Sequence, residues 1–129
     1  MSAITELIDS EVAAYRDRDL DKYLSFFAED VVVTDFEGNV LMRGIEGLRS
    51  NYQPLFENSP DLTVEIVSRI ESGGFVVDLE HLDGFINPPY PQTFDAAVIY
   101  LAPIIHEKSI EALNPFSGTR PGRSARFSH

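Results

Sequence analysis

The stretch Asp19–Gly38, DLDKYLSFFAEDVVVTDFEG, carries the clearest structural signals in the chain. Asp19 is a suitable N-cap for a second, short helix, because its side chain can accept hydrogen bonds from the first backbone N–H groups. Four apolar residues at helical spacing form the predicted buried face of that helix: Leu20, Tyr23, Leu24 and Phe27. The β-branched and aromatic run at residues 31–36 predicts a strand directly after it. Asp35 lies near the end of that strand, among apolar neighbours.

The flanking sequence extends this helix–strand unit in both directions. An amphipathic helix is predicted at residues 4–17. After a turn at 37–39, a short strand at 40–43 completes a hairpin, and a helix at 45–57 contains Pro54. Long strands follow at 62–71, 74–85 and 93–105, then a turn at 106–109 and a last strand at 110–116. Helices followed by antiparallel strands predict an α+β fold, with the helices on one face of a curved sheet.

Composition limits the protein class. A chain of 129 residues with 43% hydrophobic content is large enough for one domain, which we expect at residues 1–116, followed by a basic, flexible tail at 117–129. The net charge of −11 argues against a nucleic-acid partner and favours simple solubility. No apolar run is long enough for a membrane span, no secretory signal is recognisable and cysteine is absent, so we expect no membrane association and a cytoplasmic location.

Two segments together resemble a known family. They are VAAYRDRDLDKYLSFFAEDVVVTDFEGN at residues 12–39 and RGIEGLRSNY at residues 43–52. The order of helix, aromatic helix, acidic strand and glycine-bounded helix is similar to the nuclear transport factor 2-like superfamily, in its SnoaL-like polyketide cyclase and ketosteroid isomerase branch. The resemblance implies a cone-shaped α+β barrel with an internal cavity. It leaves the activity open, because this fold hosts isomerases, cyclases, dehydratases, hydrolases and non-catalytic binders.

The resemblance assigns roles to some residues and departs from the isomerase pattern at others. Asp35 falls on the position of the isomerase general base, and Tyr52 falls on a tyrosine that supports the oxyanion hole. The position of the catalytic phenol holds Glu11, with Tyr15 one turn further along the same helix face. The protonated aspartate of the isomerases aligns near Ile99, and the nearest acid on that strand is Asp95. The resemblance therefore implies a general base in this chain, but it does not imply the oxyanion hole of the isomerases.

Two of these side chains have alternative interpretations from the residues alone. Asp35 either caps the hairpin turn or is a pocket carboxylate with a raised pKa that takes a proton next to a carbonyl. His81 lies on a strand face with Phe75, Val77 and Leu79, which predicts an imidazole that projects into the cavity near Asp35. A structural role for His81 is the alternative.

Several aromatic residues are candidates for either the core or a ligand pocket. The sequence predicts that Phe27, Tyr52, Phe56 and Phe85 line the cavity, together with Asp95. The proline-rich segment INPPYPQTF, residues 86–94, is expected to form a rim over the cavity or to pack at a dimer interface. No metal-binding spacing or cofactor motif is present, so we expect neither group.

These observations predict a protein that binds a small apolar or cyclic carbonyl compound. If it is an enzyme, it is an isomerase or lyase of the ketosteroid isomerase or polyketide cyclase type, in which the catalytic residues are Asp35 as base with His81 and Tyr15. The alternative is a non-catalytic ligand-binding or dimerising module. In both cases we expect a homodimer through the exposed face of the sheet.

Overall fold

The computed structural model describes residues 3–101 and 105–113. Three helices come first, with one hairpin among them: α1 (Ala3–Arg16), α2 (Leu20–Leu24), β1 (Phe27–Thr34), β2 (Val40–Arg43) and α3 (Gly44–Asn58). Four long strands follow: β3 (Thr63–Ser72), β4 (Phe75–Asp83), β5 (Phe94–Leu101) and β6 (Ile105–Leu113). The predicted α+β class is confirmed. The predicted tail at 117–129 lies outside the described residues, and no described helix is long and apolar enough to cross a membrane.

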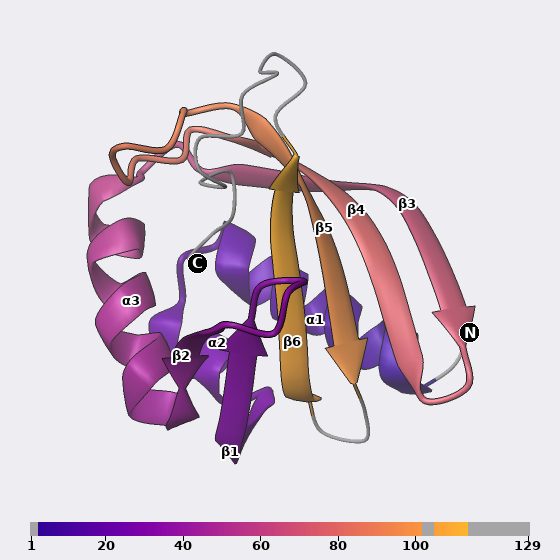
Figure 1. Ribbon diagram of the computed structural model, residues 1–129. Helices are drawn as coiled ribbons and strands as arrows, with labels where there is room; N and C mark the ends of the chain where they lie inside the picture. Colours follow the sequence, from indigo (N-terminus) through magenta and orange to yellow (C-terminus); the bar gives the residue numbers. More distant parts are fainter. Residues whose placement is uncertain (1–2, 102–104, 114–129) are drawn as a thin grey trace.

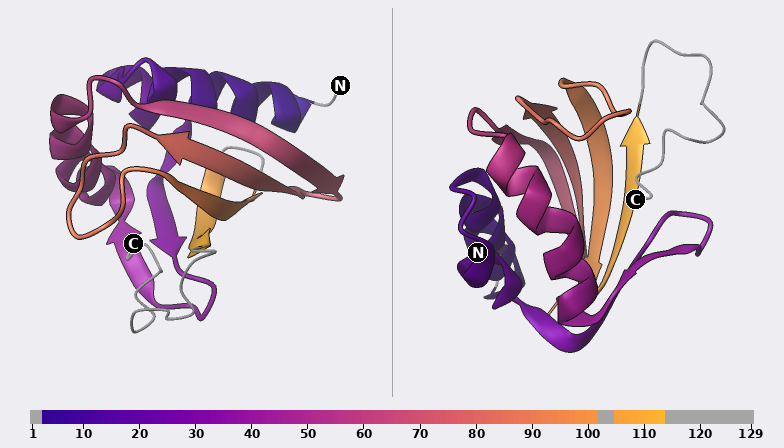
Figure 2. Two further views of the ribbon diagram at one scale, coloured as in Figure 1. Left: turned by 90° about the horizontal axis from the view of Figure 1, so that it is seen from above. Right: turned by 90° about the vertical axis from the view of Figure 1, so that its left-hand side faces the viewer.

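All six strands belong to one curved sheet in the order β2-β1-β6-β5-β4-β3 (Figure 1). Neighbouring strands run antiparallel except β1 and β6, which pair in parallel. The helices lie together on one side of the sheet, and α3 crosses beside the β1–β2 edge while α1 lies against β3 and β4 (Figure 2). The sheet therefore wraps around the helical layer, which leaves an interior between the two.

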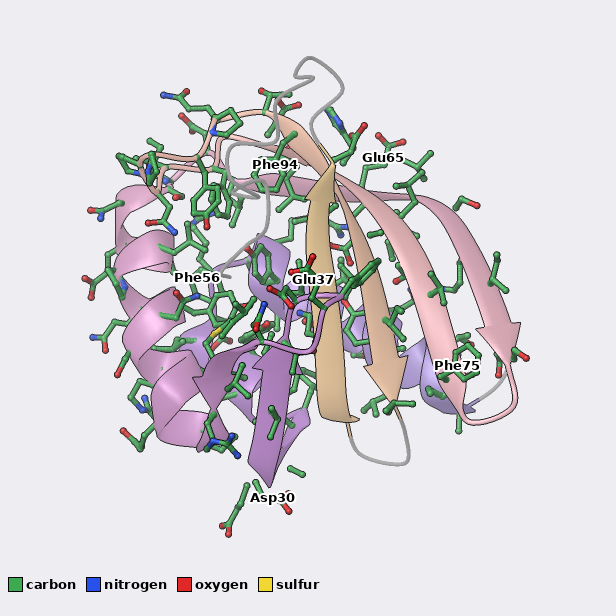
Figure 3. The ribbon with its side chains drawn as sticks, viewed as in Figure 1. Asp30, Glu37, Phe56, Glu65, Phe75 and Phe94 are labelled. Atoms are coloured by element: carbon green, nitrogen blue, oxygen red, sulfur yellow. The ribbon has the colours of Figure 1, made fainter. Side chains whose placement is uncertain are left out.

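The core fills most of this interior. Ile8 and Val12 of α1, Leu48 of α3 and Val76 of β4 are all buried, and Figure 3 shows Phe56 between α3 and the sheet. Inward-facing positions alternate along β5, as the two-residue period of a strand requires. The interior also contains charged side chains, which is rare unless they are paired.

The helix after Asp19 is shorter than the sequence predicts. Asp19 is its N-cap as expected, and its side chain accepts a hydrogen bond from the Lys22 backbone N–H at 3.2 Å. The helix ends at Leu24, however, and Phe27 begins β1 by pairing with Ile105 of β6. Phe27 is therefore buried in a strand and not on a helix face. Pairing with β6 is a long-range contact that the local pattern does not contain.

The predicted turn at 106–109 is also wrong. These residues belong to β6, which begins at Ile105 and pairs with β5 on one side and β1 on the other. The segment looks like a turn in the sequence because it is polar. Lys108 is nevertheless buried, with 5% of its surface exposed, so a charged residue occupies a core position of the strand.

The connection between β4 and β5 folds back toward α3 (Figure 1). Gly84 begins it with a φ of +72°, and a Cβ atom there would collide with the backbone carbonyl of Asp61. The Ile86 N–H donates a hydrogen bond to the Ser59 hydroxyl at 3.0 Å, and the Phe85 N–H donates to the Gln92 carbonyl at 3.1 Å. The hydrogen bond to Ser59 holds the proline-rich connection over the end of α3.

Candidate functional site

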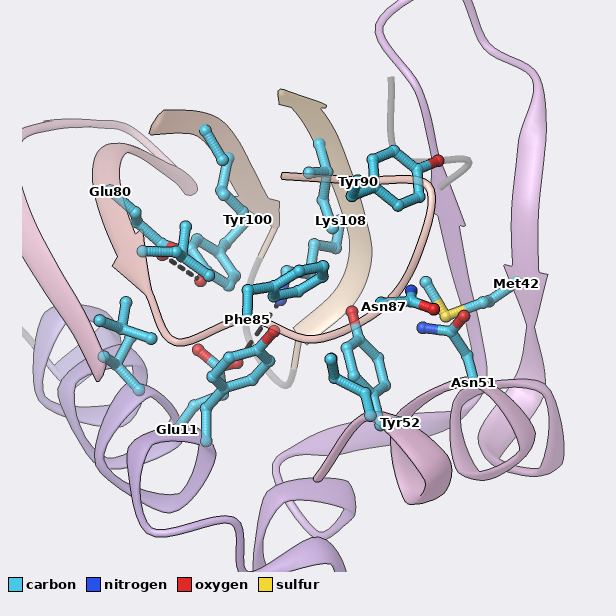
Figure 4. A pocket seen from close by; sticks show the side chains of 18 residues that line it. Glu11, Met42, Asn51, Tyr52, Glu80, Phe85, Asn87, Tyr90, Tyr100 and Lys108 are labelled. Atoms are coloured by element: carbon cyan, nitrogen blue, oxygen red, sulfur yellow. Dashed lines mark hydrogen bonds and ion pairs between the residues drawn. The ribbon is translucent and has the colours of Figure 1, made fainter. Parts of the chain in front are cut away.

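A pocket of about 70 Å³ lies between the helices and the inner face of the sheet (Figure 4). Four buried polar side chains form what we call its inner end: Glu11, Glu80, Tyr100 and Lys108. The apolar wall includes Leu55, Leu82, Phe85 and Val98. Three less buried side chains, Asn51, Asn87 and Tyr90, form the rim. A volume of this size accommodates several waters or a small organic molecule.

Lys108 and Glu11 form a buried ion pair at the inner end. The Lys108 Nζ lies 3.5 Å from Oε2 of Glu11 and donates a hydrogen bond to the Tyr23 hydroxyl at 3.2 Å. Burial acts to lower the pKa of Lys108, but Glu11, Tyr52 and Glu80 together outweigh it, so the pKa is raised. Burial raises the pKa of Glu11, although the Lys108 ammonium opposes this. A paired ammonium is thus held deep inside the fold.

Glu80 is the second carboxylate of the inner end. Its Oε2 accepts a hydrogen bond from the Tyr100 hydroxyl at 3.1 Å, and 8% of its surface is exposed. Burial raises the pKa of Glu80 from 4.5 to about 7; the Lys108 charge opposes this rise, and the Glu11 charge adds to it. A carboxyl group with this pKa exchanges its proton near neutral pH, as a general acid or base must.

Tyrosine side chains surround these charges. The ring of Tyr15 packs edge-on against those of Tyr23 and Tyr52, with centroids 5.4 and 5.8 Å away. Burial raises the pKa values of Tyr15, Tyr23 and Tyr100 well above the usual range, so their hydroxyls stay protonated at neutral pH. Tyr15 and Tyr52 both line the pocket. Tyr15 is therefore a neutral hydrogen-bond donor that a bound oxygen atom can use, and the Tyr52 hydroxyl lies on the same pocket wall.

A separate charge pair supports β4 beside the pocket. Arg69 of β3 donates two hydrogen bonds to the fully buried Asp78 carboxylate, at 2.6 and 2.8 Å, and a third to Asp9 of α1 at 2.7 Å. Such a bidentate pair is strongly directional. It joins α1 to the sheet and neutralises Asp78, which does not line the pocket.

Asp35 lies in the turn between β1 and β2. Its Oδ1 accepts hydrogen bonds from the backbone N–H groups of Glu37 and Asn39, and its Oδ2 accepts one from the Asn39 side-chain amide, all at 2.9 Å. It is buried but is not among the residues that line the pocket. This geometry favours the turn-capping interpretation that the sequence left open, and a catalytic role for Asp35 stays a prediction.

His81 and Asp95 lie on the opposite face of the sheet from the pocket. They are cross-strand neighbours, with His81 Nδ1 2.7 Å from Asp95 Oδ1, and the Asp95 hydrogen bond raises the pKa of His81. The predicted inward orientation of His81 is wrong. The inward set on β4 is Val76, Asp78, Glu80 and Leu82. Both acids can be buried because Arg69 pairs with Asp78 and the Tyr100 hydroxyl donates a hydrogen bond to Glu80. The Lys108 charge also acts on Glu80.

The other predicted site residues divide into two groups. Tyr15, Tyr52 and Phe85 line the pocket. Phe27 and Phe56 do not; their rings pack against Tyr23, with centroids 5.0 and 5.7 Å away. The rim contains Asn87 and Tyr90 of the proline-rich segment, in the position that the sequence predicted as one of two alternatives.

Sequence reasoning missed Glu80 and Lys108 as site residues. It placed Glu80 on the outer face of its strand and Lys108 in a turn, because charged residues usually mark exposed positions. The available signal was Glu11, an acid on the apolar side of α1 at the position of the isomerase phenol. A buried carboxylate is costly unless a positive charge pairs with it, and in this fold the paired residue is Lys108.

Comparison with known proteins identifies the class. The fold is that of cystatin-like and nuclear transport factor 2-like proteins. A family model described as the SnoaL-like domain matches residues 8–102, and the chain belongs to this family. Among the described residues, no group of three or more His, Cys, Asp or Glu side chains is arranged to hold a metal ion.

Three solved structures illustrate the relationship. An uncharacterised cystatin-fold protein from Novosphingobium aromaticivorans is 26% identical, with 81% of this chain and 94% of that one covered at a TM-score of 0.72. A putative SnoaL-like polyketide cyclase from Shewanella putrefaciens is 12% identical, with 87% and 80% covered and a TM-score of 0.71. A protein with a ketosteroid isomerase-like fold from Catenulispora acidiphila, in complex with trimethylamine, is 19% identical, with 81% and 83% covered and a TM-score of 0.67. None of the curated proteins matches the chain.

The raised pKa of Glu80 predicts a measurable pH dependence of stability. A carboxyl group whose pKa rises from 4.5 to about 7 on folding stabilises the fold below pH 4.5, and this contribution is lost as the pH rises through 7. We expect Glu80→Gln to remove this loss. The difference in free energy of unfolding between Glu80→Gln and the wild type should therefore shift by about 2 to 3 kcal/mol in favour of the variant from pH 5 to pH 8. Urea unfolding at each pH measures the difference.

The matched control is Glu65→Gln, which changes an exposed acid on β3. Its pH profile should remain parallel to that of the wild type. A parallel profile for Glu80→Gln as well would show that Glu80 titrates normally.

Proposed function

We propose that this protein binds a small cyclic carbonyl compound in the pocket and transfers a proton at the carbon next to the carbonyl group. One observation carries the proposal: Glu80, with a pKa of about 7, lies at the inner end of a pocket whose walls are otherwise mostly apolar and aromatic. The reaction class is that of isomerases, cyclases and dehydratases. The putative polyketide cyclase among the similar structures is consistent with it.

In the proposed reaction the ionised Glu80 carboxylate takes a proton from the carbon next to the carbonyl. The electron pair of the broken C–H bond forms the C=C bond of an enolate, and the negative charge moves to the carbonyl oxygen. The hydroxyls of Tyr15 and Tyr52 donate hydrogen bonds to that oxygen. The protonated Glu80 then returns the proton to carbon. Glu80 thus takes the role that the sequence assigned to Asp35.

The non-catalytic alternative keeps the same pocket without chemistry. It is favoured by the position of Asp35, since the carboxylate at the isomerase base position holds a turn and does not line the pocket. The Catenulispora protein shows trimethylamine bound in this type of fold. A carbonyl compound that binds in the pocket without exchange of its protons would support this alternative over proton transfer.

Deuterium exchange at the carbons next to the carbonyl of cyclohexanone, followed by NMR in D₂O, tests the proposal. We expect the wild type to accelerate exchange. The exchange rate with Glu80→Gln should be about 100-fold lower than with the wild type, and the rate with Asp35→Asn should stay within about twofold of it. Loss of exchange in Asp35→Asn alone would restore Asp35 as the base. No acceleration by the wild type would support the non-catalytic binder.

We also propose a homodimer through the outer face of the sheet. This face carries half-buried or exposed apolar side chains on adjacent strands, including Phe75, Val77 and Leu79 of β4 and Ile99 of β5, with Val77 paired with Ile99. An apolar patch of this kind on a polar protein is typical of an interface.

Light scattering tests the assembly. We expect the wild type to have the mass of a dimer at micromolar concentration and Ile99→Glu to have the mass of a monomer. The control is Phe36→Glu, which changes an exposed aromatic residue in the β1–β2 turn and should remain dimeric. A monomeric wild type would contradict the proposal.

A further inference from the structure

The inner end of the pocket contains an acceptor atom with no hydrogen-bond partner. The Oε2 atom of Glu11 faces Lys108, but Oε1 accepts no hydrogen bond in the described part of the chain, although Glu11 is only 1% exposed. The nearby Tyr100 hydroxyl, which acts to lower the pKa of Glu11, donates its hydrogen bond to Glu80. Nearly all buried polar atoms in proteins are satisfied by protein, water or ligand. The Glu11 side chain lines the pocket (Figure 4), so a molecule bound at the inner end is a candidate donor for this atom.

The charges of the inner end are also unbalanced. Glu11 and Glu80 are two carboxyl groups, and Lys108 is the one ammonium group among the described residues that line the pocket. The nearby Asp78 is already matched by Arg69. With both glutamates ionised, the inner end lacks one positive charge. In the unliganded protein, a proton on Glu80 supplies it at pH values below the Glu80 pKa of about 7.

Aromatic rings lead from the rim to this point. Tyr90 lies at the rim, and Phe85, Tyr15, Tyr52 and Tyr100 line the pocket. Ring faces attract cations, and Lys108 shows this within the site, with its Nζ 5.1 Å from the ring centroid of Tyr100. The walls thus suit a ligand that combines an apolar ring with a positive charge.

We propose that the inner end binds the protonated amine of a small cyclic ligand, which donates a hydrogen bond to Oε1 of Glu11 and supplies the missing positive charge. This deepens the proposed function, on which it rests for the use of the same pocket, by narrowing the ligand to an amine-bearing compound. Carboxylates are disfavoured there because they would add a third negative charge.

The charge balance predicts that ligand binding is linked to protonation. The groups that face Glu80 come from four elements: Glu11 and Tyr15 of α1, Asp78 of β4 itself, Tyr100 of β5 and Lys108 of β6. Of these described groups only Lys108 is cationic, so a bound ammonium takes the place of the Glu80 proton. Amine affinity should therefore rise with pH, by up to tenfold per unit below pH 7, and level off above it.

Three ligands of similar size and different charge test the proposal with the wild-type protein: benzylamine, benzyl alcohol and benzoate. Their dissociation constants are measured by isothermal titration calorimetry from pH 6 to 8. We expect benzylamine to bind at least about tenfold more tightly than benzyl alcohol at pH 8, and benzoate to bind most weakly. Only benzylamine should gain affinity with rising pH.

Two variants identify the groups responsible. Glu11→Gln should reduce benzylamine affinity by at least about tenfold and leave benzyl alcohol within about threefold. Glu80→Gln should remove the pH dependence for benzylamine. If Glu11→Gln does not fold, the ligand series on the wild type still decides the question.

The proposal is overturned if benzoate or benzyl alcohol binds as tightly as benzylamine at pH 8, or if benzylamine does not bind. These outcomes differ from failure of the proposed proton transfer, which is measured by cyclohexanone exchange. Exchange without amine binding would reject the amine site alone, whereas amine binding without exchange would reject the catalytic role alone.

Discussion

The buried ammonium of Lys108 is the interaction on which the interior depends. It lies between a carboxylate of α1 and the rings of Tyr23, Phe27 and Tyr100, each with its centroid within 5.6 Å. Removing one member of such a pair leaves an isolated charge in an apolar interior, which is strongly destabilising. Lys108 therefore joins helix α1 to the central strand β6 and, in the same position, sets the electrostatics of the pocket.

The second carboxylate turns this structural pair into a candidate reactive site. One ammonium group cannot neutralise both Glu11 and Glu80. The pKa of Glu80 is therefore raised, so that this carboxyl group gains and loses its proton near neutral pH. The tyrosines add hydroxyl donors that stay protonated. Buried charge, which costs folding free energy, is thus concentrated where a ligand would meet it, as is usual for functional sites.

The fold was readable from sequence because its signals are local. Asp19 caps its helix and the glycine-bounded segment begins α3, both as predicted. The β-branched run lies in β1 as predicted, although this strand begins earlier, at Phe27, and ends at Thr34. The site was less readable because it consists of charged residues in inward positions. The alternation on β4 was assigned to the wrong face, and Lys108 was placed in a turn, since only the tertiary arrangement supplies the partners that allow Glu80 and Lys108 to be buried. Tyr15, Tyr52 and Phe85 were found because aromatic side chains are expected inside in any case.

The central claim is that two carboxyl groups at the inner end compete for one ammonium. The most direct test is an NMR titration of the side-chain carboxyl carbons, with Glu80 assigned by comparison with Glu80→Gln. A midpoint for Glu80 near pH 7 is the predicted result. A midpoint near 4.5, the value of an ordinary glutamate, would contradict the account.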